Sequence, residues 1–516
     1  MELKSKVWRF YLLLLFSFFL QGAVVAASPD LDYEVSFDTA HHYLNVEMTV
    51  SQIDAEKTVL KLPVWAPGYY LIVDYPKLIV DFSAEDTAGR ALRWEKFGKS
   101  DWVVETKDVS SFKVKYRVYA NDYSVAESRV TKKVAFIAPN GVFMYLDGRK
   151  DLPVEVAFHM PKEWKSASTG LKRLPAAGVD SGQSVNRFYA ENIDVLYDSP
   201  LLFGNHMVMH FTHEGHAYEL ALETPDGVEE TTFVEDLKKM MSATTRLIGD
   251  VPYDRYCYIL LCAGGGGLEH FNSQACYTSG SFRFADRMDY LNFLSFITHE
   301  YFHLYNVKSI RPIELGPFDY DREVFTPMLW VSEGFTVYYE SALLRAAGLV
   351  DGDYLLNDLS GYIRTVESKE GHKHMSLRQS SYDIWLNFFN RKANAADTRI
   401  SYYDKGPILG LLMDIEIRRL TDNGKSLDDV MRALYYIYYK EKGRGFTEEE
   451  FWEVCADVAG QPLTDMRRYV NTTDAIDYER CLAYAGLELD RKNWQLRRME
   501  KVDALQEKIR KSLIGD

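Results

Sequence analysis

Cysteine is scarce in this sequence, with five residues in a chain of 516. An odd and low count for this length argues against a fold held by disulfide bonds and against a zinc site built from thiolates. Three of the five, Cys257, Cys262 and Cys276, lie close together in the sequence. One bridge among them and plain burial as small apolar side chains are both open at this point.

Basic residues are also in deficit, because 60 Lys and Arg stand against 75 Asp and Glu for a net charge of -15. Proteins that hold nucleic acid are usually basic, so this class is excluded. The chain is 47% hydrophobic and 14% aromatic, which excludes a largely disordered protein. At roughly 150 residues per domain, the length predicts three or four domains. The sequence contains neither an internal repeat nor a linker rich in Pro or Gly and Ser.

Long apolar runs are absent except at the N-terminus, where one covers residues 10–20. Basic residues precede it, and small residues follow, with Val25 and Ala27 at the -3 and -1 positions of a cleavage site. We therefore expect residues 1–27 to be a cleaved signal peptide and the protein to be exported, to the periplasm, the cell surface or the medium. The rival interpretation is an uncleaved anchor, since residues 10–27 are just long enough to span a membrane. After signal removal we expect no integral membrane span.

The pattern of apolar residues changes near residue 225. From 28 to 224 apolar and polar residues alternate with period two between turn-forming residues, which predicts an antiparallel β-sandwich. Beyond it, apolar residues recur with helical spacing. The predicted helices cover residues 229–247, 290–307, 330–346, 352–368, 405–421, 426–441 and 447–459. Residues 491–516 are predicted to form a charged helical tail.

A candidate metal motif, His-Glu-Tyr-Phe-His, occupies residues 299–303. Two histidines four residues apart lie on one face of a helix and are able to share one Zn²⁺. Glu300, next to the first histidine, is placed to take a proton from water. The motif arises by chance in roughly a few per cent of such chains, so two histidines on a packed helix are the alternative.

A downstream helix supplies a candidate third ligand, Glu333, which would complete a set of two His and one Glu with the fourth position left for water. The alternative for Glu333 is a carboxylate that stabilises the helix N-terminus. Glu340, two turns further, either orients a ligand or is solvated. A second histidine cluster, His210, His213 and His216, has strand spacing around a Glu-Gly turn and predicts a hairpin rather than a metal site.

Four motifs together resemble the glycyl aminopeptidase family of zinc metallopeptidases, which is related to the aminopeptidase N family. They are Gly-Gly-Leu-Glu-His (266–270), the histidine motif running on to Arg-Pro (299–312), Trp-Val-Ser-Glu-Gly-Phe-Thr (330–336) and Ser-Tyr-Tyr-Asp-Lys-Gly (401–406). Trp-Ala-Pro-Gly-Tyr-Tyr at 65–70 is family-like as well. The resemblance extends over about residues 30–486. Members of the family often carry a C-terminal PDZ module, which we do not expect in the charged segment after residue 489.

The resemblance implies roles for individual residues. It implies one Zn²⁺ per chain, held by His299, His303 and Glu333. Glu300 would be the general base and later the proton donor, and Tyr403 would stabilise the oxyanion. The free α-amine of the substrate would bind Glu269. The implied substrate-binding segment also includes Gly266, Gly267 and Leu268.

The expected fold is multidomain α+β. It consists of an N-terminal β-sandwich (28–224), a thermolysin-like zinc catalytic domain (225–345), a helical domain that completes the active site (346–490) and the tail (491–516). The expected function is that of an exported zinc aminopeptidase, which removes a small first residue, Gly or Ala, from peptides with a free N-terminus by attack of zinc-activated water. A zinc endopeptidase and an inactive peptide- or glycan-binding surface protein are the alternatives. The oligomeric state is left open.

Overall fold

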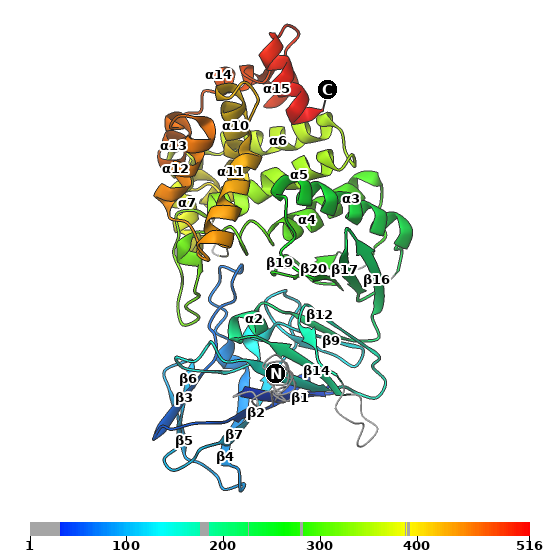
Figure 1. Cartoon of the computed structure of the whole chain (residues 1–516), viewed down its shortest axis with the longest axis vertical. Helices are drawn as coiled ribbons and strands as arrows, with labels where there is room; N and C mark the ends of the chain where they lie inside the picture. The colour runs from blue at the N-terminus through cyan, green and yellow to red at the C-terminus, as the bar shows by residue number, and fades with distance from the viewer. Residues whose placement is uncertain are drawn as a thin grey trace, which may run out of the picture.

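The computed structural model describes residues 31–175, 185–224, 226–278, 282–387, 389 and 393–515. Its β-rich half, coloured blue and cyan, lies below a helical half coloured green to red (Figure 1). The expected multidomain α+β fold is thereby confirmed. The expected signal peptide lies outside the described residues. Among the described residues, no helix is both long and apolar enough to cross a membrane.

Three sheets form the N-terminal half. The first contains seven strands in the order β13-β14-β11-β1-β2-β7-β4, and the other two are β10-β3-β6-β5 and β12-β15-β9-β8. The strands are β1 (Leu31–Asp38), β2 (Tyr43–Val50), β3 (Lys57–Lys61), β4 (Ile79–Asp86), β5 (Trp94–Phe97), β6 (Asp101–Glu105), β7 (Phe112–Tyr119), β8 (Arg129–Val130), β9 (Val134–Ile137), β10 (Tyr145–Leu146), β11 (Val154–His159), β12 (Ser166–Thr169), β13 (Lys172–Arg173), β14 (Val185–Ala190) and β15 (Leu201–Gly204). Short helices η1 (Tyr75–Leu78), η2 (Pro139–Gly141) and α2 (Ile193–Tyr197) join them.

The period-two pattern accounts for how these sheets pack. In β7 every second side chain is buried, and the same alternation runs through β1 and β2. The buried faces of the seven-stranded sheet and of its neighbours share one hydrophobic core. Most pairs are antiparallel, as expected, but β1 pairs with β11 in parallel because the chain crosses over the other strands between them.

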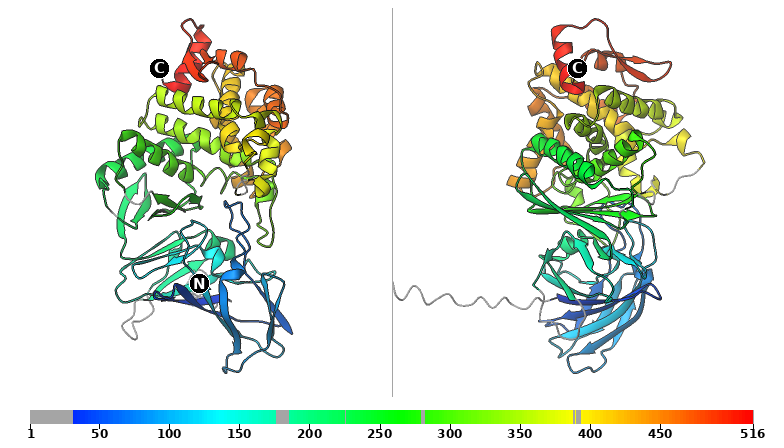
Figure 2. Two further views of the ribbon diagram at one scale, coloured as in Figure 1. Left: turned by 180° about the vertical axis from the view of Figure 1, so that it is seen from behind. Right: turned by 90° about the vertical axis from the view of Figure 1, so that its right-hand side faces the viewer.

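A five-stranded sheet, β16-β17-β18-β20-β19, lies between the β-rich half and the helices (Figure 2). Its strands are β16 (Met207–His213), β17 (His216–Leu222), β18 (Arg255–Cys262), β19 (Gly267–Glu269) and β20 (Ser273–Thr278). The histidine-rich segment forms the predicted hairpin, β16 paired with β17. This hairpin falls within the range expected for the sandwich, yet β17 pairs with β18 and so belongs to the five-stranded sheet.

Strand β18 is buried on both faces, which explains its uninterrupted apolar sequence. Tyr256, Tyr258 and Leu260 pack into the core shared with the helices. Cys257, Ile259 and Leu261 pack into a separate core with strands β9 and β15 of the N-terminal half. The two halves of the molecule are therefore joined by an apolar interface, and all five cysteines are buried free thiols.

Helices cover the remaining face of the sheet and form most of the rest of the molecule. They are α3 (Glu230–Ile248), α4 (Arg287–Phe302), η3 (Ile313–Leu315), the π-helical turn η4 (Trp330–Gly334), α5 (Phe335–Ala346), α6 (Gly352–Glu367), η5 (Glu370–Lys373), α7 (Leu377–Tyr382), α8 (Ile384–Asn387), α9 (Ala395–Thr398), α10 (Tyr402–Leu420), α11 (Leu427–Leu434), the π-helical turn η6 (Tyr435–Glu441), α12 (Glu448–Ala459), α13 (Thr464–Asn471), α14 (Tyr478–Ala483) and α15 (Ala504–Ile514).

Two predicted helices differ from the structure. The helix expected over 290–307 ends at Phe302, because the residues after His303 turn away to meet the segment that carries Glu333. The expected helical tail is helical only in α15, since residues before it pair as the hairpin β21 (Leu487–Asp490) and β22 (Gln495–Arg498). Ile509, Leu513 and Ile514 of α15 are buried, so the tail is packed against the domain despite its charge.

Helix α10 crosses the π-helical turn η4 at two glycines. A Cβ atom on Gly406 would lie 2.5 Å from the Cα of Gly334, and one on Gly334 would lie 2.6 Å from the Cα of Gly406. The two backbones are thus in direct contact, which leaves no room for any side chain. This contact sets the position of α10 relative to Glu333, the residue directly before Gly334.

We expect Gly406→Ala to destabilise the protein by about 1–3 kcal/mol, the usual cost of forcing an extra methyl group into a close-packed site. The measurement is urea unfolding followed by circular dichroism. Gly361→Ala is the matched control, because Gly361 also lies in a helix, α6, but a Cβ there meets nothing within 4 Å. Its substitution is expected to stabilise by about 0.5–1 kcal/mol through helix propensity. Equal effects of the two substitutions would contradict the proposed backbone contact.

Candidate active site

Helix α4 presents two histidines on its last turn. His299 lies on the final turn and His303 follows directly as the C-terminal capping residue. Their Nε2 atoms are 3.0 Å apart, which is the outcome expected for i and i+4 positions on one helix face. The side chains are 12% and 2% exposed, so both rings are largely shielded from solvent.

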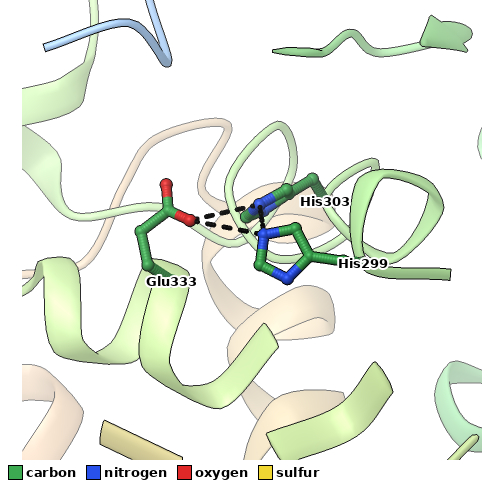
Figure 3. A group of neighbouring side chains, drawn as sticks. All are labelled: His299, His303 and Glu333. Carbon is green, nitrogen blue, oxygen red and sulfur yellow. Dashed lines mark hydrogen bonds and ion pairs between the residues drawn. The ribbon is translucent and has the colours of Figure 1, made fainter. Parts of the chain in front are cut away.

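The π-helical turn η4 brings Glu333 against both rings (Figure 3). Its Oε2 atom lies 3.3 Å from Nε2 of His303 and 3.6 Å from Nε2 of His299. Ligands at the 2.0–2.1 Å distances typical of tetrahedral zinc lie roughly 3.3–3.4 Å from one another. The three donor atoms therefore have the spacing that one zinc ion requires, and π-helical turns are common at such functional positions.

The outer ring nitrogens settle which atoms face the centre. Nδ1 of His303 is 2.7 Å from the backbone oxygen of Asn306, which accepts but does not donate, so this nitrogen carries the proton. Nδ1 of His299 similarly lies 2.9 Å from Oε2 of Glu340. The Nε2 atoms therefore face each other and Oε2 of Glu333, and in the neutral form of each ring they carry the lone pair that binds a metal. Such a buried arrangement fits a cation at its centre, and partners of this kind orient metal-bound histidines.

Asn306 ties the two ligand-bearing segments together. Its fully buried side-chain amide donates to the backbone oxygens of Val331 and Ser332, at 2.8 and 3.1 Å, and to the hydroxyl of Thr336. The same residue supplies the carbonyl that orients His303. One asparagine thus links the end of α4 to the turn that carries Glu333. The motif at 299–312 contains it, but no role had been predicted for it.

Glu300 faces the neighbouring strand β19. A Cβ atom on Gly267 would lie 2.1 Å from Oε1 of Glu300, so the carboxylate occupies the space that a side chain at Gly267 would fill. Glu300 is 5% exposed, and burial raises the pKa of its carboxyl to about 7. Burial thus favours the proton-bound form and makes this carboxylate a stronger base than an exposed glutamate.

Strand β19 forms the edge of the five-stranded sheet. Successive side chains alternate between its faces, and those of Gly267 and Glu269 share the face toward α4. Leu268 points the other way, into the core between the two halves of the molecule, so only its backbone remains at the edge. Gly266 hydrogen-bonds through its oxygen to the backbone N–H of Tyr277, which anchors the start of the strand.

Glu269 lies beside the metal ligands. One of its carboxylate oxygens, one of Glu300 and a ring nitrogen of His303 are all within 4.8 Å of one another. A loop from the N-terminal half presses on Glu269 from the other side, because a Cβ on Gly68 would be 2.6 Å from its Oε1. Gly68 has φ +84° in a tight turn with Pro67 before it, a conformation that favours glycine. Figure 1 shows this loop, in blue after β3, rising toward the helical half.

Two tyrosines approach the site from opposite halves of the chain. Tyr403 lies on the first turn of α10, where its backbone N–H donates to the hydroxyl of Ser401, and its ring centre is 6.5 Å from that of His299. Burial, together with the charge of Glu333, raises the pKa of Tyr403 well above its ordinary value, so it remains a neutral donor. Tyr70, from the loop of Gly68, is 4% exposed, and the same two effects raise its pKa. Its position had not been predicted, although the motif at 65–70 contains it.

Two family models match parts of this chain. Residues 32–205 match the model of the peptidase M61 N-terminal domain, and residues 292–409 match that of the M61 glycyl aminopeptidase. The chain belongs to the M61 glycyl aminopeptidase family. The second match contains the histidine motif, Glu333 and Tyr403, and Glu269 lies outside both matches. None of the curated proteins compared with this M61 chain matches it.

Solved structures extend the relationship. The crystal structure of an aminopeptidase N family protein from Idiomarina loihiensis is 28% identical to this M61 chain, with a TM-score of 0.82, and the match covers 89% of this chain and 78% of the other. The M1 zinc metallopeptidase of Deinococcus radiodurans is 14% identical, with a TM-score of 0.53 and coverage of 86% and 94%, which shows a shared fold. Family and fold together make the protein a metallo-aminopeptidase.

We expect Glu340→Gln to lower zinc affinity about 10- to 100-fold, because it removes the charged acceptor that orients His299. The measurement is a competition titration of the purified protein with a zinc chelator. Glu370→Gln is the matched control, since Glu370 is 63% exposed and pairs only with Lys373 among the described residues. An unchanged affinity in Glu340→Gln would mean that Glu340 is merely solvated.

Proposed function

We propose that the protein is a zinc-dependent aminopeptidase that hydrolyses the first peptide bond of a substrate with a free N-terminus. The observation that carries the proposal is the position of Glu269. It is a buried carboxylate at the end of an edge strand, within 4.8 Å of both Glu300 and a metal-ligand histidine. A carboxylate in this position binds an ammonium group one residue away from the bond that is to be cleaved.

The substrate would bind as an added strand. An extended peptide pairs with the exposed backbone groups of an edge strand, which here is β19. The absence of a side chain at Gly267 allows a close approach of the peptide backbone to Glu300. Glu269 then holds the α-ammonium and so sets the register of the peptide, with its first carbonyl in front of the metal ligands.

Each polar group of the site has one task in the reaction. We assign one zinc ion per chain to His299, His303 and Glu333, and bound zinc would lower the pKa of a water ligand to about 7 and polarise the scissile carbonyl. Glu300 accepts the proton of the attacking water at its carboxylate and passes it to the leaving amine. The hydroxyl of Tyr403 donates to the oxygen on which negative charge develops.

We propose that the first residue of the substrate is small, Gly or Ala, as the family name suggests. The contact of the Gly68 loop with Glu269 supports cleavage at a chain end, because it narrows the space beside the ammonium site. The endopeptidase alternative lacks a comparable observation. An inactive binding protein would not need a buried carboxylate such as Glu300 beside the metal-ligand histidines.

We also propose that the protein is exported to the periplasm, the cell surface or the medium. The support is the sequence of residues 1–27, which has the basic start, apolar centre and small residues of a cleaved signal. N-terminal sequencing of the protein recovered from the natural cell tests this proposal. A mature chain that begins near residue 28 is the expected result, and a chain that begins at Met1 would contradict it.

We expect the wild-type protein to cleave free alanyl and glycyl peptides but not their N-acetylated forms, and to lose this activity when zinc is chelated. We expect Glu269→Gln to lower kcat/KM for free peptides about 10- to 100-fold, since a charged hydrogen bond to the ammonium is lost. The assay is mass spectrometry of a peptide panel, and Glu95→Gln in the exposed strand β5 is the control. Equal cleavage of free and acetylated peptides would favour the endopeptidase alternative.

We expect Glu300→Gln to lower kcat about 10²- to 10⁴-fold, the usual contribution of a general base, while zinc content stays at that of the wild type. The substitution conserves shape and removes only the basic oxygen. Turnover and zinc, measured on the same preparation by peptide hydrolysis and atomic emission, separate the loss of the base from the loss of the metal. Retention of wild-type kcat would refute the assignment of Glu300.

A further inference from the structure

Glu269 lies in the wall of a cavity of about 290 Å³ that residues of both halves of the molecule line. Among the described residues its carboxylate forms neither a hydrogen bond nor an ion pair, which leaves it open for the proposed substrate ammonium. Apart from one histidine, the charged residues of the wall are Asp194, Asp198, Glu269, Lys308 and Arg311. Three carboxylates against two cations leave one negative charge, which is the charge that one ammonium neutralises.

A lysine of the same wall, Lys308, brings a second ammonium group close to Glu269. Its side chain is 10% exposed. Although burial opposes the charged form, the charges of Asp198 and Glu269 raise the pKa of Lys308 above its ordinary value, so the side chain carries a full positive charge. Within the described chain no ion pair joins Lys308 to Glu269. Two opposite charges in one wall thus remain apart, which requires a group that holds the lysine back.

Asp198 is the group that holds Lys308. It directly follows α2 in the N-terminal half, and its Oδ1 atom accepts from Nζ of Lys308 at 2.7 Å. The two side chains are 25% and 10% exposed, so the pair is largely shielded from the solvent that weakens ion pairs at a surface. Burial opposes the ionisation of Asp198, yet Lys308 and His270 lower its pKa to about 2. The carboxylate is therefore ionised at neutral pH.

The same carboxylate holds the turn that follows Glu269. Its Oδ1 atom lies 3.1 Å from Nδ1 of His270, which therefore carries a proton, and its Oδ2 atom accepts from the backbone N–H of Phe271 at 2.9 Å. His270 and Phe271 come directly after Glu269, the last residue of β19. Within the described sheet this edge strand pairs with β20 alone, so contacts beyond its end help to fix it. One carboxylate of the N-terminal half thus contacts both the strand that carries Glu269 and the lysine beside it.

We propose that Asp198 is a positioning residue of the ammonium site, which keeps Lys308 from pairing with Glu269 and so leaves Glu269 open to the α-ammonium of the substrate. This inference rests on the proposed aminopeptidase function. Without the charge of Asp198, the buried ammonium of Lys308 would lack a partner, which is costly. After Asp198, Glu269 is the carboxylate whose charge acts most on Lys308. The flexible lysine would then pair with Glu269 and compete with the substrate.

The first test is Asp198→Asn in the zinc-loaded full chain, assayed on alanyl peptides with a free N-terminus. The substitution removes the charge but keeps an oxygen that accepts hydrogen bonds. We expect kcat/KM to fall about 10- to 100-fold, mainly through a rise in KM, because Lys308 occupies Glu269 in most molecules and lowers the fraction able to bind substrate. Zinc content is expected to stay at that of the wild type.

Removing the lysine as well separates this role from a merely structural one. We expect Asp198→Asn combined with Lys308→Met to regain most of the lost kcat/KM, since no internal cation is left to pair with Glu269. An aspartate that only joined the two halves predicts no recovery, because the double variant lacks the ion pair entirely. Asp321→Asn is the matched control and is expected to retain the wild-type KM. Asp321 also accepts from a lysine of the other half, Lys61, at 2.6 Å, but lies outside the cavity wall.

Lys308→Met alone keeps the inference testable if Asp198→Asn does not fold. We expect it to lower KM for alanyl peptides, because the cavity wall becomes more negative and attracts an ammonium more strongly. A structural ion pair predicts instead that removal of either partner impairs the enzyme alike. A rise in KM in Lys308→Met would overturn the inference.

Binding without turnover gives an independent readout. In the Glu300→Gln background, we expect L-alanyl-L-alanine to raise the melting temperature, Asp198→Asn to remove this shift, and added Lys308→Met to restore it. The N-acetylated dipeptide is expected to give a smaller shift that these substitutions leave unchanged. A wild-type KM in Asp198→Asn, or no recovery in the double variant, would overturn the inference alone. Failure of the wild type to cleave any free peptide would overturn the proposed function, and the inference with it.

Discussion

Three electron-pair donors converge at one buried point, and most of the catalytic half is arranged around this constraint. His299, His303 and Glu333 approach one another to between 3.0 and 3.6 Å through atoms that bind metal ions in neutral histidine and ionised glutamate. A divalent cation at this point would contact all three donor atoms and so stabilise their close approach. The surrounding structure then serves to hold the donors in place through Asn306, Glu340 and the backbone contact of Gly334 with Gly406.

Three glutamates occupy this small space, and their surroundings give them different chemistry. Glu333 faces two imidazoles, which hold the pKa of its carboxyl below the ordinary range although burial opposes its ionisation. Glu300 lies next to a bare strand edge, and burial raises its pKa. Glu269 lies at the boundary between the metal site and a cavity. Three glutamates are thereby suited to three different proposed roles, Glu333 as metal ligand, Glu300 as base and Glu269 as the group that binds the amine. The difference comes from their environments alone.

The site is assembled from both halves of the molecule. The central strand β18 of the five-stranded sheet is buried on both faces, so its apolar contact with β9 and β15 fixes the N-terminal half against the catalytic half. That contact brings the Gly68 loop against Glu269, and residues of both halves line one cavity beside it. The β-rich half is therefore part of the proposed substrate site as well as a structural support. A catalytic half alone would retain the metal ligands but lose one wall of that cavity.

The sequence by itself determined whatever depends on near neighbours along the chain. The pairing of His299 with His303 follows from helical spacing, the hairpin of β16 and β17 from alternation around a turn, and the order of β-rich and helical halves from the change of period. The resemblance of whole motifs added Glu333, Tyr403 and Glu269 to the predicted site. Residue spacing alone was insufficient to assign them their roles. Only the tertiary structure decided that β17 belongs to the five-stranded sheet and that α4 ends at Phe302. It alone also decided where Asn306, Tyr70 and Arg311 lie relative to the site. These features depend on contacts between residues far apart in sequence, and such contacts do not produce a periodic pattern of apolar residues in either segment.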